Sequence, residues 1–327
     1  MNNKIFFVNT KHGNHLVASK TIKEFALEYV DSIKIDGDIV ILVRSDLIGL
    51  TNKMIKKFIN KKAEQEILIG VLDSTPCIAL INSSLLNKFF PDINSFYHNI
   101  KQEWITFSLA HDMLKLLNTT VKIASFNEEV QNKLRQNAID TGVYLQDSST
   151  TYLSHDTRFG SGVIIEPNVY IGANVKLHDY VHIKAFSYLE GAEIETRAEI
   201  GPFARIRGNS RIGTKVKIGN FVEIKNTELA SGTKASHLSY IGDSKIGKNV
   251  NIGAGVITCN YDGFKKHSTI IKDNSFIGSN SSLIAPLTIG SNSLIGAGSF
   301  INKDVPDNTF AQGRTKQIMK NNRNIGK

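Results

Sequence analysis

The sequence predicts two parts, an α/β domain followed by a parallel β-helix built from hexapeptide repeats. Short apolar runs alternate with amphipathic stretches up to about residue 126. From residue 163 onward an aliphatic residue recurs every six positions, and glycine often follows it, as at Gly172, Gly201 and Gly213. An amphipathic α-helix cannot keep a period of six, because its apolar stripe would wander around the helix axis.

The first part alternates predicted strands with predicted helices. Such an order is typical of a parallel or mixed sheet that is covered on both faces. The strands are expected at residues 5–8, 39–43, 67–72, 77–81 and 120–125, and the helices at 21–33, 54–59 and 104–117. A further helix from Asn127 to Thr141, ended by Gly142, leads out of this domain. The expected divisions are 1–126 for this α/β domain, 127–162 for a linker helix and entry segment, 163–314 for the β-helix and 315–327 for a basic tail.

The hexapeptide pattern fits a triangular coil. Six residues make one flat side and one corner, with the aliphatic residue pointing inward, and each coil buries its apolar face against the next. With three sides per coil, residues 163–312 make roughly eight coils. The aliphatic positions are 165, 171, 177, 183 and 189, then, after a slip of one residue, 194, 200, 206, 212, 218 and 224, and later 271, 277, 283, 289, 295 and 301.

The composition of the 327 residues, 41% hydrophobic and 21% charged, is typical of a soluble two-domain protein. No stretch approaches a membrane span and the N-terminal apolar run is too short for a signal peptide, so we expect a cytoplasmic protein. The net charge of +9 suits phosphorylated ligands better than nucleic acid, because no Arg-rich run is present. Cys77 and Cys259 lie in different predicted domains and support neither a disulfide framework nor a zinc ribbon.

One stretch, from Gly232 to Asp262, interrupts the six-residue pattern twice with polar, Gly-rich sequence. A regular scaffold has no structural need for such an interruption, so we expect chemistry there. The chemistry-bearing side chains in this stretch are His237, Tyr240, Asn251, Asn260 and Tyr261.

Six segments of the β-helix resemble one enzyme family. They are GPFARIR (201–207), IGNFVEIKN (218–226), KASHLSYIGD (234–243), GKNVNIGAGVITCNYDG (247–263), FIGS (276–279) and GAGS (296–299). From about Asn127 to Arg314 the chain is similar to the acetyltransferase half of the bacterial bifunctional glucosamine-1-phosphate N-acetyltransferases / N-acetylglucosamine-1-phosphate uridyltransferases. The resemblance implies transfer of an acetyl group from acetyl-CoA to glucosamine 1-phosphate, in the synthesis of the UDP-N-acetylglucosamine used for cell-wall precursors. It also implies a homotrimer and a left-handed coil, an exception to the usual handedness of parallel crossovers.

His237 is the candidate general base. An amine with a pKa near roughly 8 is largely protonated at neutral pH, so a base beside it assists the reaction, and histidine is suited to that task. The position of His237 matches the base of the family. The alternative from spacing alone is a histidine that is hydrogen-bonded at a corner.

The resemblance assigns the remaining substrate contacts. A guanidinium group can hold a phosphate in a fork and lysines add point charges. Arg207 and Lys225 follow inward aliphatic residues on successive coils, and Lys266 lies in a protruding loop. The resemblance implies that these three cations bind the phosphate, that Tyr240 and Asn251 contact the sugar, and that Glu223 supports them. It implies acetyl-CoA contacts at Ala254, Asn260, Tyr261, Ser279, Ala297 and Arg314.

The first part departs from the family. Strand 5–8 is followed by NTKHGNHL, in which Gly13 is the single glycine, so the Gly-rich nucleotide loop is missing. Asp46 corresponds to a possible Mg²⁺ ligand, which matters if uridylyl transfer persists. We therefore expect a shortened, degenerate uridyltransferase half without activity, the alternative being a chain that is still bifunctional.

Two further alternatives remain from the sequence. A zinc carbonic anhydrase on the same coil needs three convergent histidines, of which His178 and His182 would supply two. A non-catalytic β-helix scaffold would not bind acetyl-CoA.

Overall fold

We describe the protein from a computed structural model, which covers residues 119–317 and Met319 in detail and, in the first 118 residues, a set of strands. The chain divides into two compact units, Met1–Asn132 and Lys133–Lys327. Among the described residues, no helix has the length and apolar character needed to cross a bilayer.

The described strands of the first unit form a mixed sheet. Its order is β1 (Lys4–Val8), β4 (Ile39–Arg44), β7 (Thr75–Asn82), β6 (Ile67–Leu72) and β8 (Thr106–Ser108). The β1–β4 and β6–β8 pairs are parallel, whereas β7 runs antiparallel to both of its neighbours. Two short antiparallel pairs add β2 (Leu16–Val17) with β3 (Lys20–Thr21) and β5 (Leu47–Ile48) with β9 (Lys115–Leu116).

Four of the five strands expected in this unit are confirmed. The helix expected at 104–117 is wrong at its described positions, because β8 and β9 occupy them. A short apolar run cannot be assigned by periodicity alone, and here the run at Thr106–Ser108 extends the sheet beside β6. The helices expected at 54–59 and over most of 21–33, and the possible magnesium ligand Asp46, lie outside the described residues.

The strand expected at 120–125 is also wrong, because helix α4 (Thr120–Asp140) covers it. The Thr119 hydroxyl accepts a hydrogen bond from the Lys122 backbone N–H at 3.3 Å, which caps the first turn and starts the helix before Asn127. The predicted end is confirmed: Gly142 has φ +91°, and the Val143 N–H reaches back to the Ala138 carbonyl at 3.0 Å.

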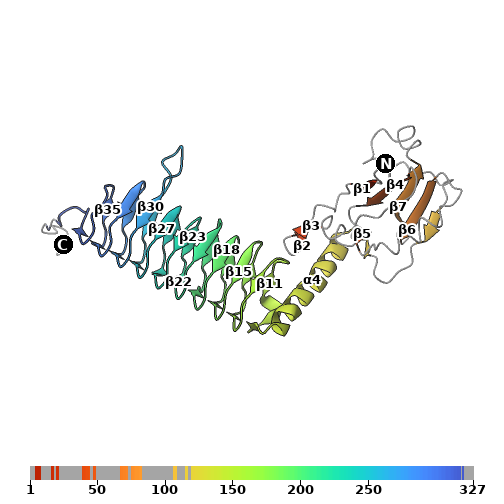
Figure 1. Cartoon of the computed structure of the whole chain (residues 1–327), viewed down its shortest axis with the longest axis horizontal. Helices are drawn as coiled ribbons and strands as arrows, with labels where there is room; N and C mark the ends of the chain where they lie inside the picture. Colours follow the sequence, from red (N-terminus) through yellow and green to blue (C-terminus); the bar gives the residue numbers. More distant parts are fainter. Residues whose placement is uncertain are drawn as a thin grey trace, which may run out of the picture. The chain divides into compact units, whose positions relative to one another are not determined.

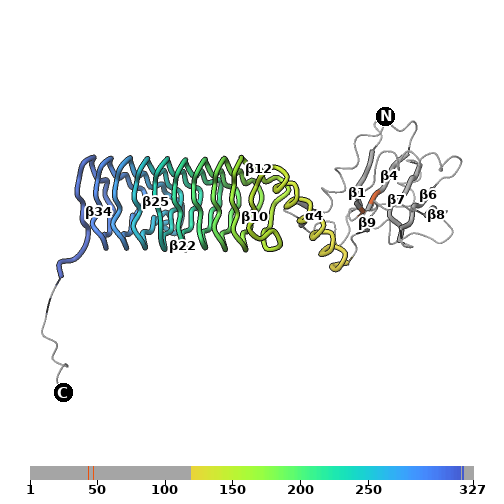
Figure 2. Tube along the Cα trace, turned by 90° about the horizontal axis from the view of Figure 1, so that it is seen from below, coloured from red at the N-terminus to blue at the C-terminus, as the bar shows by residue number. Residues whose placement is uncertain are grey.

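The second unit is the expected parallel β-helix of hexapeptide repeats, in which successive coils stack along one axis (Figure 2). Its strands form three parallel sheets, one on each side of the coil. Sheet D contains β10 (Tyr144–Leu145), β13 (Ile164–Ile165), β16 (His182–Ile183), β19 (Glu199–Ile200), β22 (Lys217–Asn220), β25 (Lys234–His237), β28 (Asn251–Ile252), β31 (Phe276–Ile277), β34 (Leu294–Ile295) and β36 (Phe310–Ala311).

The other two sides are sheets E and F. Sheet E contains β11 (Tyr152–Leu153), β14 (Tyr170–Ile171), β17 (Tyr188–Leu189), β20 (Arg205–Arg207), β23 (Glu223–Lys225), β26 (Tyr240–Gly242), β29 (Ile257–Cys259), β32 (Ser282–Ile284) and β35 (Phe300–Ile301). Sheet F contains β12 (Arg158–Phe159), β15 (Val175–Leu177), β18 (Ala192–Ile194), β21 (Ser210–Ile212), β24 (Glu228–Leu229), β27 (Ser244–Ile246), β30 (Thr269–Ile271) and β33 (Leu287–Ile289).

The solenoid begins about one coil earlier than residue 163, because β10, β11 and β12 already pair with β13, β14 and β15. A short 3₁₀ helix, η2 (Ser148–Thr150), makes a corner of this first coil. The aliphatic residues of the repeat fill the interior, as expected; Ile165, Ile206 and Ile289, for example, are completely buried. Burial of this stack supplies the main stabilisation of a solenoid, since each coil covers its neighbour.

The two interruptions expected at Gly232–Asp262 differ in kind. Around His237 the coil continues: Ala235 takes the inward position, while Thr233 and Ser239 are buried and donate to backbone carbonyls across the coil. Small and hydroxylated side chains therefore replace the aliphatic pattern without breaking the coil. The second interruption, residues 260–268, is an insertion between β29 and β30, and it projects from the solenoid beside β30 (Figure 1).

Candidate active site

The corner between sheets D and E places His237 at the start of a row of small residues. On successive coils the equivalent positions are Asn220, His237, Ala254, Ser279 and Ala297. Each of these residues is followed by one with positive φ: Phe221 (57°), Leu238 (51°), Gly255 (74°), Asn280 (57°) and Gly298 (70°). Backbone hydrogen bonds stack the positions, for example from Asn280 N to the Ala254 carbonyl (2.7 Å) and from Gly298 N to the Ser279 carbonyl (2.8 Å). We call these five residues the His237 corner.

The His237 corner leaves the backbone accessible on the C-terminal side of the imidazole. Ala254 is half-buried, whereas Ser279 and Ala297 are exposed. The preceding glycine, Gly278, is packed so closely on the backbone of Ala297 that a Cβ atom would clash with the Ala297 nitrogen. Small side chains along a surface row allow a long, thin ligand to approach the main chain, so the row fits a pantetheine arm.

The resemblance assigns Ala254, Ser279 and Ala297 to acetyl-CoA, and all three lie at this corner. A fourth assigned residue, Arg314, contacts it. The Arg314 guanidinium donates from Nη1 to the Ala297 carbonyl at 3.1 Å, which holds this exposed cation at the far end of the row from His237. Asn260 and Tyr261 lie elsewhere, in the insertion that leaves sheet E.

The second corner, between sheets E and F, carries the expected cations. Arg207 and Lys225 are direct register partners in β20 and β23, which confirms that they lie on adjacent coils. The Lys266 side chain reaches Lys225 from the insertion: the Lys266 ammonium group, then desolvation and the Arg207 guanidinium, lower the pKa of Lys225 from its ordinary value, against a smaller opposing effect of the Asp243 carboxylate. We call Arg207, Lys225 and Lys266 the cation corner.

Glu223 holds one member of the cation corner. Its Oε1 accepts a hydrogen bond from Arg207 Nε at 2.7 Å, and Arg205 Nη1 lies 3.9 Å away. This bond uses the Nε–H of Arg207 and not its two Nη groups. Glu223 and Asp243 supply two carboxylates against the three cations, so the corner keeps a net positive charge that attracts an anion.

Tyr240 lies on sheet E beside Glu223, its register partner. Its hydroxyl is 3.5 Å from Nδ2 of Asn260, and Asn260 in turn donates to the Asp243 carboxylate, as does Asn226 Nδ2 at 2.6 Å. The Asn260 side chain is buried in this network, at 7% exposure. Its amide therefore braces Tyr240, while its backbone N–H donates to the Thr258 carbonyl at 2.9 Å and its carbonyl accepts from the His267 N–H at 2.8 Å.

Asn251 is not brought to the cation corner within one chain. It lies on β28 in sheet D, in register with Lys234, whereas Arg207, Lys225 and Tyr240 are on sheet E. The His237 corner separates these two faces.

The insertion 260–268 is a tight hairpin that positions Lys266. Asp262 accepts the backbone N–H groups of Phe264 and Lys265, each at 2.8 Å, and its Oδ2 lies 2.6 Å from His267 Nε2. The Lys265 amide first, and then His267, hold the pKa of Asp262 well below its usual range. Tyr261 is exposed and donates its hydroxyl to the Gly263 carbonyl at 2.7 Å.

Sequence reasoning missed Asn220, Asp243 and Asn226. Asn220 could have been found, because it precedes His237 by the 17 residues that separate register partners on these coils. The amide and carboxylate contacts around Asp243 carry no such periodic signal.

The geometry separates the two histidines of the carbonic anhydrase alternative. His182 is on sheet D, 2.8 Å from Glu166, whereas His178 follows β15 of sheet F and lies 2.7 Å from Glu193. Across residues 119–317, the structure places no three His, Cys, Asp or Glu side chains in an arrangement able to hold a metal ion.

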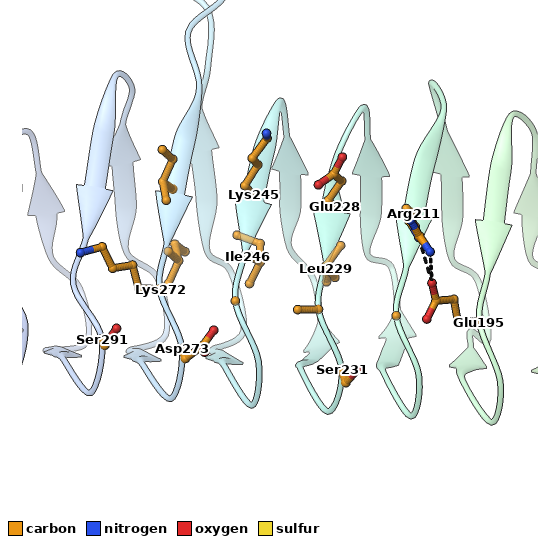
Figure 3. Close-up of a pocket in the computed structure, with 15 residues that line it drawn as sticks. Glu195, Arg211, Glu228, Leu229, Ser231, Lys245, Ile246, Lys272, Asp273 and Ser291 are labelled. Carbon is orange, nitrogen blue, oxygen red and sulfur yellow. Dashed lines mark hydrogen bonds and ion pairs between the residues drawn. The ribbon is translucent and has the colours of Figure 1, made fainter.

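A wider groove lies on sheet F, away from these corners (Figure 3). Its floor includes Leu229 and Ile246, and Arg211 and Glu195 form an ion pair at 2.6 Å at one end. None of the residues expected at the site lines this groove.

Comparisons with known proteins confirm the resemblance found in the motifs. A model of the bacterial transferase hexapeptide (six repeats) matches residues 156–191 and 268–303. The chain is 45% identical over 236 residues to the bifunctional protein GlmU of Zymomonas mobilis, covering 72% of this chain and 52% of that protein. It is 50% identical over 195 residues to the bifunctional protein GlmU of Bartonella bacilliformis, covering 60% and 43%. The chain thus spans about half the length of these curated relatives.

Solved structures with a similar coil include LpxA from Acinetobacter baumannii. It is 21% identical, with a TM-score of 0.38, over 53% of this chain and 71% of that one.

Proposed function

We propose that this chain, a relative of the bifunctional GlmU proteins, transfers the acetyl group of acetyl-CoA to the amine of glucosamine 1-phosphate. The observation that carries the proposal is the placement of His237. On the coils that follow, the positions equivalent to His237 form the row of small residues. Within its own coil, His237 is followed by the strand of sheet E, which leads to the cation corner. His237 thus lies between a surface row of small residues suited to a thioester arm and three cations suited to a phosphate.

His237 acts as general base in this proposal. It takes the proton that the amine loses as the new C–N bond forms and passes it to the sulfur as the C–S bond of the thioester breaks, so that CoA leaves as a thiol. Ala254, Ser279 and Ala297 line the path of the pantetheine arm, Arg314 and Tyr261 complete the contacts, and Asn260 supports them by holding Tyr240. A positioned base typically contributes 10²- to 10⁴-fold to the rate, in keeping with one histidine.

The cation corner binds the sugar phosphate. Its two lysines repel each other in the free protein, and a dianion between them replaces repulsion with charge-assisted hydrogen bonds. Tyr240 contacts the sugar ring from sheet E, and Glu223 keeps Arg207 aligned.

Asn251 requires a second copy of the chain, and we propose a homotrimer in which sheet D of one copy faces sheet E of the next. An exposed apolar ridge supports this arrangement. Phe186, Phe203 and Phe221 stack on one another, at 4.8 and 5.2 Å between ring centroids, and Leu238, 60% exposed, continues the ridge beside His237. Phe203→Ser should lower the oligomer mass in solution.

The first unit is not expected to catalyse uridylyl transfer, because residues 9–16 lack the Gly-rich nucleotide loop. Release of pyrophosphate from UTP and N-acetylglucosamine 1-phosphate would overturn this part of the proposal and favour a bifunctional enzyme.

A thiol-release assay with purified protein tests the acetyltransferase proposal. We expect CoA release that depends on glucosamine 1-phosphate and falls by at least about 100-fold in His237→Ala. His178→Ala, which removes a surface histidine on another sheet, should keep full activity. Equal activity of His237→Ala and wild type would rule out the mechanism, and failure of acetyl-CoA to bind in calorimetry would favour a scaffold.

A further inference from the structure

Asn220 contacts His237 directly from the preceding coil. The two residues are register partners in β22 and β25, and Oδ1 of Asn220 lies 2.7 Å from Nδ1 of His237. The Leu238 N–H donates to the Asn220 carbonyl at 3.0 Å, so the backbone next to the histidine is tied to the same residue. The side-chain oxygen and the backbone carbonyl of Asn220 therefore both help to fix the position of the imidazole.

The chemistry of this contact differs from that of three other histidines in the solenoid. His178, His182 and His267 each lie within 2.8 Å of a carboxylate oxygen, those of Glu193, Glu166 and Asp262. A carboxylate favours the protonated imidazolium form, whereas a neutral amide does not. The coils on either side of His237 add no charge at this corner, since they present Asn220 and Ala254, and the nearest cations along β25 and β22 are Lys234 and Lys217.

We propose that Asn220 is a positioning residue that makes Nε2 of His237 the basic nitrogen. A neutral imidazole carries one N–H and one lone pair, and an amide oxygen can only accept. With Asn220 Oδ1 accepting from Nδ1–H, the lone pair stands on Nε2, the ring atom turned away from the coil that holds Asn220. The inference rests on the proposed function, because it assigns the nitrogen that takes the proton of the substrate amine.

The contact also holds the ring in the orientation in which Nε2 accepts a proton. When Nε2 takes a proton, Nδ1–H keeps the same partner, so the ring does not have to turn during the reaction. Loss of the partner frees the ring to rotate and to exchange tautomers, which lowers the fraction that is aligned for catalysis.

The test compares Asn220→Ala and Asn220→Asp in the full-length protein. Asn220→Ala should lower kcat about tenfold, with the KM for acetyl-CoA and for glucosamine 1-phosphate within twofold of wild type. Asn220→Asp supplies an acceptor again and should recover most of kcat at alkaline pH, while the acid limb of the pH–rate profile moves up by about one pH unit. A purely structural role would lower the melting temperature without moving that limb.

The matched control is Glu166→Gln. Glu166 is the partner of His182, a partly exposed histidine on the same sheet as His237. It should leave both kcat and the pH profile unchanged. Nitrogen NMR of ¹⁵N-histidine-labelled protein, with the His237 signal assigned by its loss in His237→Gln, reads the tautomer without any activity. We expect the Nδ1–H form in wild type and a mixture in Asn220→Ala.

The two possible failures are distinguishable. An inactive wild type whose His237 ring is in the Nδ1–H form, with that form lost in Asn220→Ala, would refute the proposed function and retain the pairing. An active wild type with the Nε2–H tautomer, or with kcat and acid limb unaltered in both Asn220 variants, would overturn the inference.

Discussion

Replacement of Lys225 by methionine should weaken ligand binding without weakening the fold. In the free protein the Lys225 ammonium group faces Lys266 and Arg207, and this like-charge contact lowers its pKa. The repulsion is present at neutral pH and is relieved as the pH rises through the lowered pKa. Methionine keeps the aliphatic stem and removes the charge, so Lys225→Met should melt at the wild-type temperature or slightly above it.

The loss should be in the affinity for the phosphate. A hydrogen bond to a charged group is worth enough that its removal weakens binding by about 10- to 150-fold, and glucosamine without phosphate should lose nothing. Calorimetric titration with both ligands measures this, and the loss should shrink in 1 M salt, where the Debye length is about 3 Å.

Lys217→Met is the matched control. Lys217 is on the same coil as Lys225 but pairs with Glu199 at 2.8 Å, so its removal should cost a little stability and no phosphate affinity. A Kd for glucosamine 1-phosphate within twofold of wild type in Lys225→Met, or an equal loss in Lys217→Met, would refute the assignment of the cation corner.

Three further predictions concern the path for acetyl-CoA, the core and the insertion. Ala254→Leu should raise the KM for acetyl-CoA at least about tenfold, whereas Ala185→Leu, at the same corner on the other side of His237, should stay within twofold; equal KM values would contradict the path. Ile206→Ala, at a completely buried position, should lower the free energy of unfolding by about 2–5 kcal/mol in urea denaturation, and a loss below about 1 kcal/mol would argue against a packed coil interior. Because the pKa of Asp262 is lowered from 3.8, its support of the insertion is present above that pH and lost as the pH falls; Asp262→Asn should therefore speed tryptic cleavage after Lys265 at pH 7, and an unchanged rate would contradict this role.

The fold of the second unit could be predicted from the sequence because its core repeats. An aliphatic residue every six positions is best buried inside a triangular coil, and the aliphatic residues from Ile165 to Ile301 are buried in this way. The spacing of six in fact extends back from Ile165 through Phe159 to Leu153, and it is lost only before Leu153, where the 3₁₀ turn places Leu145 eight residues earlier.

Prediction was weaker where local signals conflict. Val121 and Ile123 alternate as in a strand, but the cap at Thr119 starts a helix in which Ile123 is buried and Val121 is 73% exposed. The alternating pattern favours a strand there, but the capped helix forms because it buries Ile123.

At the candidate site, spacing along the coil could predict neighbours on one corner. Arg207 and Lys225 follow from the repeat, whereas the approach of Lys266 depends on the hairpin that Asp262 and His267 stabilise. The buried Asn260 side chain could not be anticipated either, since its partners come from other coils.

Mass spectrometry of the sugar product, after incubation of the protein with acetyl-CoA, tests the central claim most directly. We predict that glucosamine 1-phosphate gains one acetyl group on nitrogen, with one CoA released per product, and that N-acetylglucosamine 1-phosphate, which lacks a free amine, gains none. Acetylation of both sugars, or of neither by a folded protein, would contradict the assignment of His237 as the base for an amine.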